Sequence, residues 1–276
     1  MLTTPVVVGL DVGHSAVKVA MGPSNRQIFR SLAVPAIAIS DEHEAARAAR
    51  ETVEVNGRPW FFGETAEVQG GGAITTGLSD EWVETPEHTA LLKGALSLVS
   101  RHGMTLDAKS LLVLGLPVRL FKSQGESLKQ IASDLTEAEI KVVPQPIGPY
   151  HSVMLDMHGR PHTDRSMRNE SWAVIDVGYY TTDFLLMMNG RWVEKASGSA
   201  KGVHVAAEAM QRALKEKGIE VDLPDCEAAM QSKTVRHFGI KDVTADVDLA
   251  ASLVVSEVID TAERFITPYV LSLIHI

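Results

Sequence analysis

Two stretches of this chain alternate apolar and polar positions in the same way. Residues 6–20 read VVVGLDVGHSAVKVA, and residues 173–188 read AVIDVGYYTTDFLLMM. Each is an apolar, β-rich run that ends in Asp-Val-Gly and is followed by a second apolar run with one charged residue inside it. The pattern predicts a strand, a tight turn and a second strand, used once in each half of the chain.

The remaining apolar spacing in the first half predicts alternating strands and helices. Apolar positions at helical spacing run from Pro86 to the stop signal at Gly103. Asn56-Gly57 between two apolar runs predicts a hairpin, and Gly70, Gly71 and Gly72 predict a loop. Further segments are expected as strands at 5–12, 15–21, within 26–39, 110–117 and 139–146, and as helices near 125–135 and 150–157, with 41–51 either helical or mobile.

The second half repeats this theme. We expect strands at 172–177, 180–188 and 191–197, with a turn at Asn189-Gly190, and a helix at 203–217 that Gly218 closes. Residues 219–245 read as a small inserted helical region, and a long amphipathic helix begins at Asp246.

These elements predict an α/β fold of two similar lobes, each a mixed sheet flanked by helices. The first lobe is expected at 1–147 with a small insertion at about 35–85, and the second at 148–276 with a small helical insertion at about 219–245. Ligands of such folds sit at strand ends, so both Asp-Val-Gly turns are expected to face one cleft.

Composition and charge disfavour several classes of function. The chain has 276 residues, 26 basic and 35 acidic side chains and a net charge of −9, which disfavours general binding to nucleic acid. Its single cysteine, Cys226, fits a reducing cytoplasm. No apolar run is long enough to span a membrane, and because the N-terminus leads directly into a predicted strand, no signal peptide is expected.

Asp11 and Asp176 are the strongest candidates for chemistry. A carboxylate at a strand end can hold hydrated Mg²⁺, and a glycine turn can present backbone N–H groups to phosphates, which points to Gly13 and Gly178. The alternative for one copy alone is a structural Asp turn bonded to its own backbone. Two matched copies favour a polyphosphate site.

Neighbouring residues add candidates. Lys18 shares a strand face with Ala16 and Ala20 and is either a phosphate ligand or an exposed strand residue. Ser15 offers a hydroxyl and an N–H, whereas His14 is more often an ordinary turn residue than a proton shuttle. In the second copy, Thr181 and Thr182 offer hydroxyls and Asp183 a second carboxylate, unless Asp183 is a solvated strand residue.

Gln145 lies in VVPQPIGPY, directly after a strand and between two prolines. Because proline fixes the backbone, this amide is held in place and can orient a water near a γ-phosphate. The alternative is a surface turn glutamine. We find no zinc-type spacing, no nucleophile–base pair and no P-loop signature in the sequence.

Taken together, these motifs resemble the actin-like ATPases, and within them the plasmid-segregation proteins of the ParM/StbA type. The matching stretches are the two Asp-Val-Gly hairpins, the LLVLGLPVRLF run, the VVPQPIGPYHSVM connection and GSAKGVHVAAEAM at 198–210. They cover roughly residues 6 to 270 in the family's order.

The resemblance implies two ribonuclease-H-like lobes with an ATP- and Mg²⁺-binding cleft between them. By family position, Asp11 and Asp176 organise Mg²⁺ through waters, and Gln145 positions the attacking water where many segregation relatives use Glu. The residues implied in nucleotide contact are Gly13, His14, Ser15, Lys18, Gly178, Tyr179, Thr181, Thr182 and Asp183, with Lys201 and Gly202 near the ribose.

One departure from the family pattern is expected to matter. After its long helix the family continues into a strand, a glycine-rich loop that packs on the adenine, and a final helix, whereas this sequence ends in LSLIHI. We interpret the chain as a C-terminally truncated copy, in which nucleotide affinity and the stability of the first lobe are both reduced.

The expected function is an ATPase that forms cytomotive, head-to-tail filaments in the cytoplasm, for plasmid DNA segregation. The implied partners are further copies of the chain and a DNA-binding adaptor, with no direct nucleic-acid or membrane contact. Three alternatives stay open: a small-molecule kinase, a chaperone-type ATPase, and a binding module that has lost ATP turnover.

Overall fold

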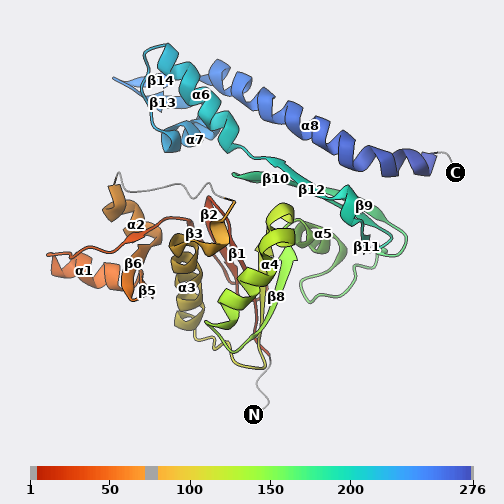
Figure 1. Ribbon diagram of the computed structural model, residues 1–276, viewed down its shortest axis with the longest axis horizontal. Helices are drawn as coiled ribbons and strands as arrows, with labels where there is room; N and C mark the ends of the chain where they lie inside the picture. The colour runs from red at the N-terminus through yellow and green to blue at the C-terminus, as the bar shows by residue number, and fades with distance from the viewer. Residues whose placement is uncertain (1–4, 72–79, 275–276) are drawn as a thin grey trace. The chain divides into compact units, whose positions relative to one another are not determined.

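The computed structural model describes residues 5–71 and 80–274 (Figure 1). The described chain divides into two compact units. The first runs to Gly148 and also includes Leu155–Arg160; the second consists of Pro149–Met154 and the described residues from Pro161 onward. Each unit is described by itself below. Gly72, which the sequence places in a loop, lies outside the described residues.

The first unit is built on a five-stranded mixed sheet with the strand order β3-β2-β1-β7-β8. The pairs β1–β2 and β2–β3 are antiparallel, whereas β1–β7 and β7–β8 are parallel. The mixed sheet and the pairing of the first two strands are predicted by the sequence pattern, whereas the strand order is not. The strands are β1 (Val7–Val12), β2 (Ala16–Ala20), β3 (Arg26–Arg30), β7 (Leu111–Leu116) and β8 (Glu139–Pro144).

Two helices pack on this sheet: α3 (Pro86–Arg101) lies on β1 and β2, and α4 (Val118–Ser133) lies on β7 and β8. Thr85 caps α3 by accepting the His88 N–H, and Pro86 occupies the first turn, where its missing N–H costs nothing. The core between them joins alternate strand residues to the apolar face of α3, and includes Val8, Leu10, Leu91, Leu112 and Leu114.

Helix α4 begins earlier than the sequence indicates. It starts at Val118, directly after Pro117, rather than near residue 125. Gly125 does not break it, because the space beside this glycine is bordered by Phe121 and Val142 and the helix is supported by packing rather than by propensity.

A smaller sheet, of order β4-β6-β5, carries two short helices. The predicted hairpin is confirmed: Asn56 and Gly57 connect β5 to β6 with φ values of 52° and 73°, as a two-residue turn of this type requires. Helix α2 was not expected from the sequence. The elements are β4 (Ala33–Pro35), α1 (Glu42–Ala49), β5 (Thr52–Val55), β6 (Arg58–Phe62) and α2 (Gly63–Gly70).

The main sheet of the second unit is antiparallel throughout its described strands, with β10 paired to β9, β11 and β12. The predicted strand at 191–197 is wrong beyond Trp192, because a 3-10 turn at Glu194–Ala196 interrupts it and the Ser197 hydroxyl bonds back to Val193. The strands are β9 (Ser171–Val177), β10 (Thr181–Met188), β11 (Arg191–Trp192) and β12 (Gly198–Lys201).

The rest of this unit is mainly helical, as Figure 1 shows, and the long final helix is confirmed. The prediction that 219–245 is helical is only partly right, because α7 is followed by a hairpin, β13–β14, whose turn places Phe238 at φ 50° and Gly239 at φ 121°. The elements are α5 (Ile147–Met154), α6 (His204–Glu216), α7 (Leu223–Ser232), β13 (Thr234–Arg236), β14 (Ile240–Asp242) and α8 (Thr244–Ile274).

Helices α6, α7 and α8 share an apolar core in which Met210, Leu214 and Val247 are buried. Within the ranges that the structure covers, no helix combines the length and the apolar character needed to cross a membrane.

Candidate functional site

The first Asp-Val-Gly hairpin brings a carboxylate and a lysine together. Asp11 on β1 lies directly opposite Lys18 on β2, and residues paired in this way point to the same face of the sheet. The Lys18 Nζ is 3.1 Å from Asp11 Oδ2, and the side chains are 61% and 23% exposed. Such an exposed ion pair contributes little to stability, so the amino group can exchange Asp11 for another anion at small cost.

On the other side of Asp11, a glycine makes room for a glutamine. Gly115 of β7 is the parallel-strand neighbour of Asp11, and a Cβ at this position would lie 3.1 Å from the Gln145 Cγ. The Gln145 Nε2 donates to Asp11 Oδ1 at 2.5 Å, and its backbone N–H donates to the Leu116 carbonyl at 2.7 Å. The structure therefore brings Asp11, Lys18 and Gln145 together, as separate sequence motifs indicate.

The motifs in the sequence did not identify Gly115 as a site residue. Its signal was present, because a glycine inside a continuous apolar strand marks a close approach of another group.

Gly13 is required by space rather than by an unusual φ angle. A Cβ there would lie 3.0 Å from the Ala16 carbonyl oxygen, and Gly13 is not among the glycines with positive φ. Ser31 fastens the loop, since its hydroxyl donates to the Gly13 carbonyl at 2.5 Å and its N–H donates to the Ser15 carbonyl at 3.0 Å. The Gly13 N–H makes no hydrogen bond to another described residue.

His14, the turn histidine, packs against a buried tryptophan. Its ring stacks on Trp82 at a centroid distance of 5.0 Å, and Trp82 in turn meets the edge of His88 at 5.5 Å. Burial, and then the nearby His14, lowers the pKa of His88 to about 3, so His88 is uncharged at neutral pH.

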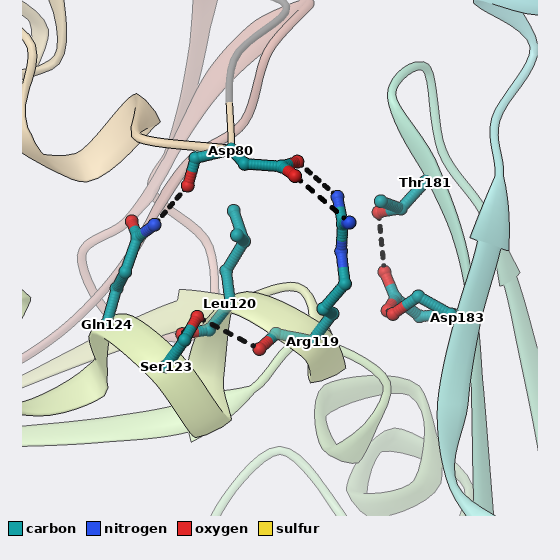
Figure 2. A network of polar contacts seen from close by, with 8 residues as sticks. Asp80, Arg119, Leu120, Ser123, Gln124, Thr181 and Asp183 are labelled. Carbon is teal, nitrogen blue, oxygen red and sulfur yellow. Dashed lines mark hydrogen bonds and ion pairs between the residues drawn. The ribbon is translucent and has the colours of Figure 1, made fainter.

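The second hairpin places two carboxylates opposite each other. Asp183 on β10 pairs with Asp176 on β9 and with Ser199 on β12. Asp183 is buried, which rules out the solvated strand residue considered above. Its carboxylate accepts the Thr181 hydroxyl at 2.8 Å, as Figure 2 shows, and also accepts the Ser199 hydroxyl. Asp176 is half-buried, and its carboxylate makes no hydrogen bond or ion pair with another described residue.

The second glycine turn is tighter than the first. A Cβ at Gly178 would lie 2.8 Å from the Thr181 carbonyl oxygen, and the Gly178 N–H donates to that same oxygen at 2.9 Å. The expectation that this glycine leaves its own amide free is therefore wrong, because the turn closes on itself.

The segment directly after β12 packs against the backbone of this turn. The Gly202 N–H donates to the Tyr180 carbonyl at 2.9 Å, and a Cβ at Gly202 would lie 2.3 Å from the Tyr179 carbonyl oxygen. The Thr182 hydroxyl donates to the Lys201 carbonyl at 3.1 Å, while the Lys201 side chain is exposed. Lys201 and Gly202 thus lie beside the second hairpin, with Gly202 serving its packing.

Tyr179 is anchored within its own unit. Burial raises the pKa of its hydroxyl above the ordinary value, and the Glu227 and Glu208 carboxylates raise it further. The hydroxyl therefore stays protonated and faces helices α6 and α7.

The donor set fits hydrated Mg²⁺ rather than a closed metal cage. In the part of the chain that the structure describes, no three His, Cys, Asp or Glu side chains converge as a metal site. Mg²⁺ usually keeps several waters and binds one or two protein carboxylates together with substrate phosphates. Strand-end carboxylates such as Asp11 and Asp176 suit that role.

Solved structures of similar shape are actin-like proteins. A ParM filament from Clostridium botulinum is 17% identical, with a TM-score of 0.70 over 95% of this chain and 84% of that chain. A crystal structure of an archaeal actin homolog is 20% identical, with a TM-score of 0.71 over 94% and 81%. A MamK double helical filament is 18% identical, with a TM-score of 0.69 over 96% and 81%. A search of curated protein sequences gave no match.

The sequence also matches a family profile, that of the actin-like proteins' N-terminal domain, over residues 9–148. This range contains Asp11, Gly13, Lys18, Gly115 and Gln145, and is just over half of the chain. With the α/β architecture and the likeness to the solved actin-like folds, the chain belongs to the actin-like protein family.

Proposed function

We propose that this chain binds and hydrolyses ATP and assembles into cytomotive filaments that serve plasmid DNA segregation. The observation that carries the proposal is the row formed by Lys18, Asp11 and Gln145, with the Gly13 amide alongside. A cation, a strand-end carboxylate, a fixed amide and a backbone donor are the groups that phosphoryl transfer needs, because positioning and electrostatics supply most of its catalysis.

In this proposal Asp11 and Asp176 take part in holding hydrated Mg²⁺. When bound, Mg-ATP supplies the phosphoryl group and the cation that neutralises its charge. The absence of a described partner for Asp176 supports its role, since a carboxylate opposite a second one gains from a nearby cation.

Lys18, the Gly13 N–H and Ser15 are the proposed phosphate contacts of the first hairpin. The exposure of Lys18 supports this assignment, because its amino group can leave Asp11 for a phosphate. In the second hairpin, the hydroxyls of Thr181 and Thr182 already serve Asp183 and Lys201, so the proposed contacts are made by the backbone between Gly178 and Thr181. Lys201 and Gly202 stay proposed for the ribose side.

Gln145 is proposed to orient the attacking water. Its backbone bond to Leu116 and its packing over Gly115 hold the side chain at Asp11, which supports a positioned rather than a mobile amide. Because Asp11 is proposed to work through metal-bound waters, the amide lies within reach of the same solvent.

Self-assembly is proposed because the fold is similar to that of proteins whose structures were solved as filaments. Two of the similar structures are described as filaments, of ParM and of MamK. The net charge of −9 supports an indirect link to DNA through a basic adaptor. The single, buried Cys226 is compatible with the proposed cytoplasmic location.

Sedimentation tests this function. We expect the chain at tens of micromolar, a concentration suited to weak repeated contacts, to pellet with ATP and Mg²⁺ and to stay in the supernatant with ATP and EDTA. Asp176→Ala in the same assay is expected to stay in the supernatant. Equal pelleting of all three samples would show assembly that does not depend on nucleotide, and no pelleting at all would contradict the filament proposal.

A further inference from the structure

A short strap, residues 80–85, connects helix α4 with the first Asp-Val-Gly loop. At its start, Arg119 of α4 forms a two-pronged ion pair with the Asp80 carboxylate, with Nη1 at 3.2 Å from Oδ2, and Gln124 donates to the Asp80 carbonyl. Figure 2 shows both side chains reaching from α4 to Asp80. Near its end, the Ser127 hydroxyl of α4 donates to Glu84 at 3.3 Å.

Between these two contacts with α4, the indole of Trp82 is buried in the core of the first unit. Trp82 is 2% exposed, and its Nε1–H donates to the Val12 carbonyl at 3.1 Å. Its ring stacks on His14 with 26° between the ring planes. Thr85 holds the backbone of the strap behind the indole, because its hydroxyl donates to the Trp82 carbonyl at 2.8 Å.

The bond to Val12 fixes the direction of the next amide. The Val12 carbonyl and the Gly13 N–H belong to one peptide group, which is planar and trans, so they point in opposite directions. Holding the carbonyl toward Trp82 aims the Gly13 N–H away from it. That amide makes no hydrogen bond to another described residue, so no acceptor within the described chain sets its direction.

We infer that Trp82 is a positioning residue for phosphate binding. Through its bond to Val12 and its stacking on His14, it presets the Gly13 amide in the direction that a phosphate oxygen requires. This inference deepens the proposed function and rests on it, because a preset amide serves catalysis only where a nucleotide binds. A buried tryptophan that only fills the core would support the whole unit equally and would have no specific effect on this loop.

Hydrogen exchange of the ligand-free protein tests the inference without any nucleotide. Trp82→Phe keeps an aromatic ring but removes the N–H. We expect the Ser31 amide, which donates to the Ser15 carbonyl of this loop, to exchange about threefold to tenfold faster than in the wild type, as the loss of one buried hydrogen bond implies. Trp192→Phe is the matched control, since it also removes an indole N–H bond, to Ser197, but in the second unit. Unchanged exchange of the Ser31 amide in Trp82→Phe overturns the inference.

Nucleotide binding then separates this inference from the proposed function. We expect Trp82→Phe to weaken Mg-ATP binding about threefold to tenfold, and Trp192→Phe to leave it unchanged. If the wild type does not bind Mg-ATP, the proposed function fails, while the exchange result still decides whether Trp82 sets the loop.

A measurement on the intact chain covers the case in which Trp82→Phe does not fold. The chain has four tryptophans, so its indole N–H signals can be resolved by NMR and that of Trp82 assigned by elimination with Trp60→Phe, Trp172→Phe and Trp192→Phe. We expect the Trp82 signal to be protected from exchange and to shift when Mg-ATP is added. A rapidly exchanging signal, or one that ignores bound Mg-ATP, overturns the inference.

Discussion

The two Asp-Val-Gly hairpins share one backbone plan but differ in what they place on it. In both, a glycine lies against the carbonyl of the residue three positions later, Ala16 or Thr181. In both, the Asp faces the residue seven positions on across an antiparallel pair, which is Lys18 in the first hairpin and Asp183 in the second. The same geometry therefore carries an acid–base pair in one unit and an acid–acid pair in the other.

This difference separates adaptable contacts from fixed ones. The first hairpin has an exposed ion pair and a glycine amide without a described partner, both of which can change partners at small cost. The second hairpin buries its extra carboxylate and satisfies it with two hydroxyls, and its glycine amide closes the turn. We expect substitutions in the first hairpin to affect ligand binding more, and substitutions in the second to affect folding more.

The largest effect on stability is expected at Gly202, which packs against the turn of the second hairpin. Gly202→Ala would place a methyl group 2.3 Å and 2.6 Å from two carbonyl oxygens, and we expect a loss of about 3 kcal/mol or more. Gly13→Ala meets one oxygen at 3.0 Å, and we expect a loss of about 1 kcal/mol. Urea unfolding of both variants measures the difference, and equal losses of stability would contradict the conclusion that the second turn is packed more tightly than the first.

The next effect concerns hydrolysis in the first hairpin. Gln145→Ala is expected to slow ATP hydrolysis about 10-fold to 1000-fold, as the loss of one positioning group does, with a smaller change in ATP affinity. Ser199→Ala, which removes a hydroxyl donor from Asp183, is expected to lower stability and to spare the turnover of bound ATP. Single-turnover rates at saturating ATP decide, and a Gln145 variant impaired in binding alone would make Gln145 a structural residue.

His88, which contacts the tryptophan beneath the first loop, should make stability depend on pH. Its folded-state pKa of about 3 lies below the unfolded value near 6.5, so the unfolded chain takes up a proton first as the pH falls. Stability is therefore present above pH 6.5 and is lost below it, by about 2 kcal/mol between pH 7.5 and pH 5.

Urea titrations at both pH values measure this loss. His88→Gln is expected to remove that part of the pH dependence. Leu91→Val on the same helix, which destabilises without adding or removing a titrating group, should retain it. A pH dependence that is the same in all three proteins would contradict the assigned pKa of His88.

The smallest contrast compares the partners of the two carboxylates. Thr181→Val leaves buried Asp183 with one donor fewer, at an expected cost of about 1–2 kcal/mol. Lys18→Met removes an exposed ion pair, at an expected cost below about 0.5 kcal/mol, but lowers Mg-ATP affinity about tenfold or more. Thermal unfolding measures the two losses of stability, and ATP titration measures the two losses of affinity. A Lys18→Met variant that loses more stability than Thr181→Val, or that binds Mg-ATP as tightly as the wild type, would contradict this contrast.

Elements whose structure depends on the local residue pattern could be predicted from the sequence. Apolar runs gave β1, β7 and β8, and both Asn-Gly pairs form turns, with Asn189 at φ 51° and Gly190 at φ 74°. Elements whose structure depends on tertiary packing could not be predicted in this way. Helix α4 continues through Gly125, and the Ser197 hydroxyl ends the strand expected at 191–197.

The same division applies to the site. Asp11, Gly13 and Lys18 could be found because they repeat a motif, and Gln145 because proline flanks it. Trp82 carries no motif, since its bond to Val12 joins residues 70 positions apart and only the fold brings them together. That Asp183 is buried, rather than exposed like Lys18, depends on the hydroxyls of Thr181 and Ser199, which strand alternation alone does not reveal.

Calorimetric titration of Mg-ATP into the wild type, Asp11→Ala and Asp176→Ala shows whether both hairpins serve nucleotide binding. We expect micromolar binding to the wild type and a loss of affinity of at least about 30-fold in each variant, with unchanged circular dichroism. Variants that bind Mg-ATP as tightly as the wild type, or a wild type that gives no binding heat, would contradict this expectation.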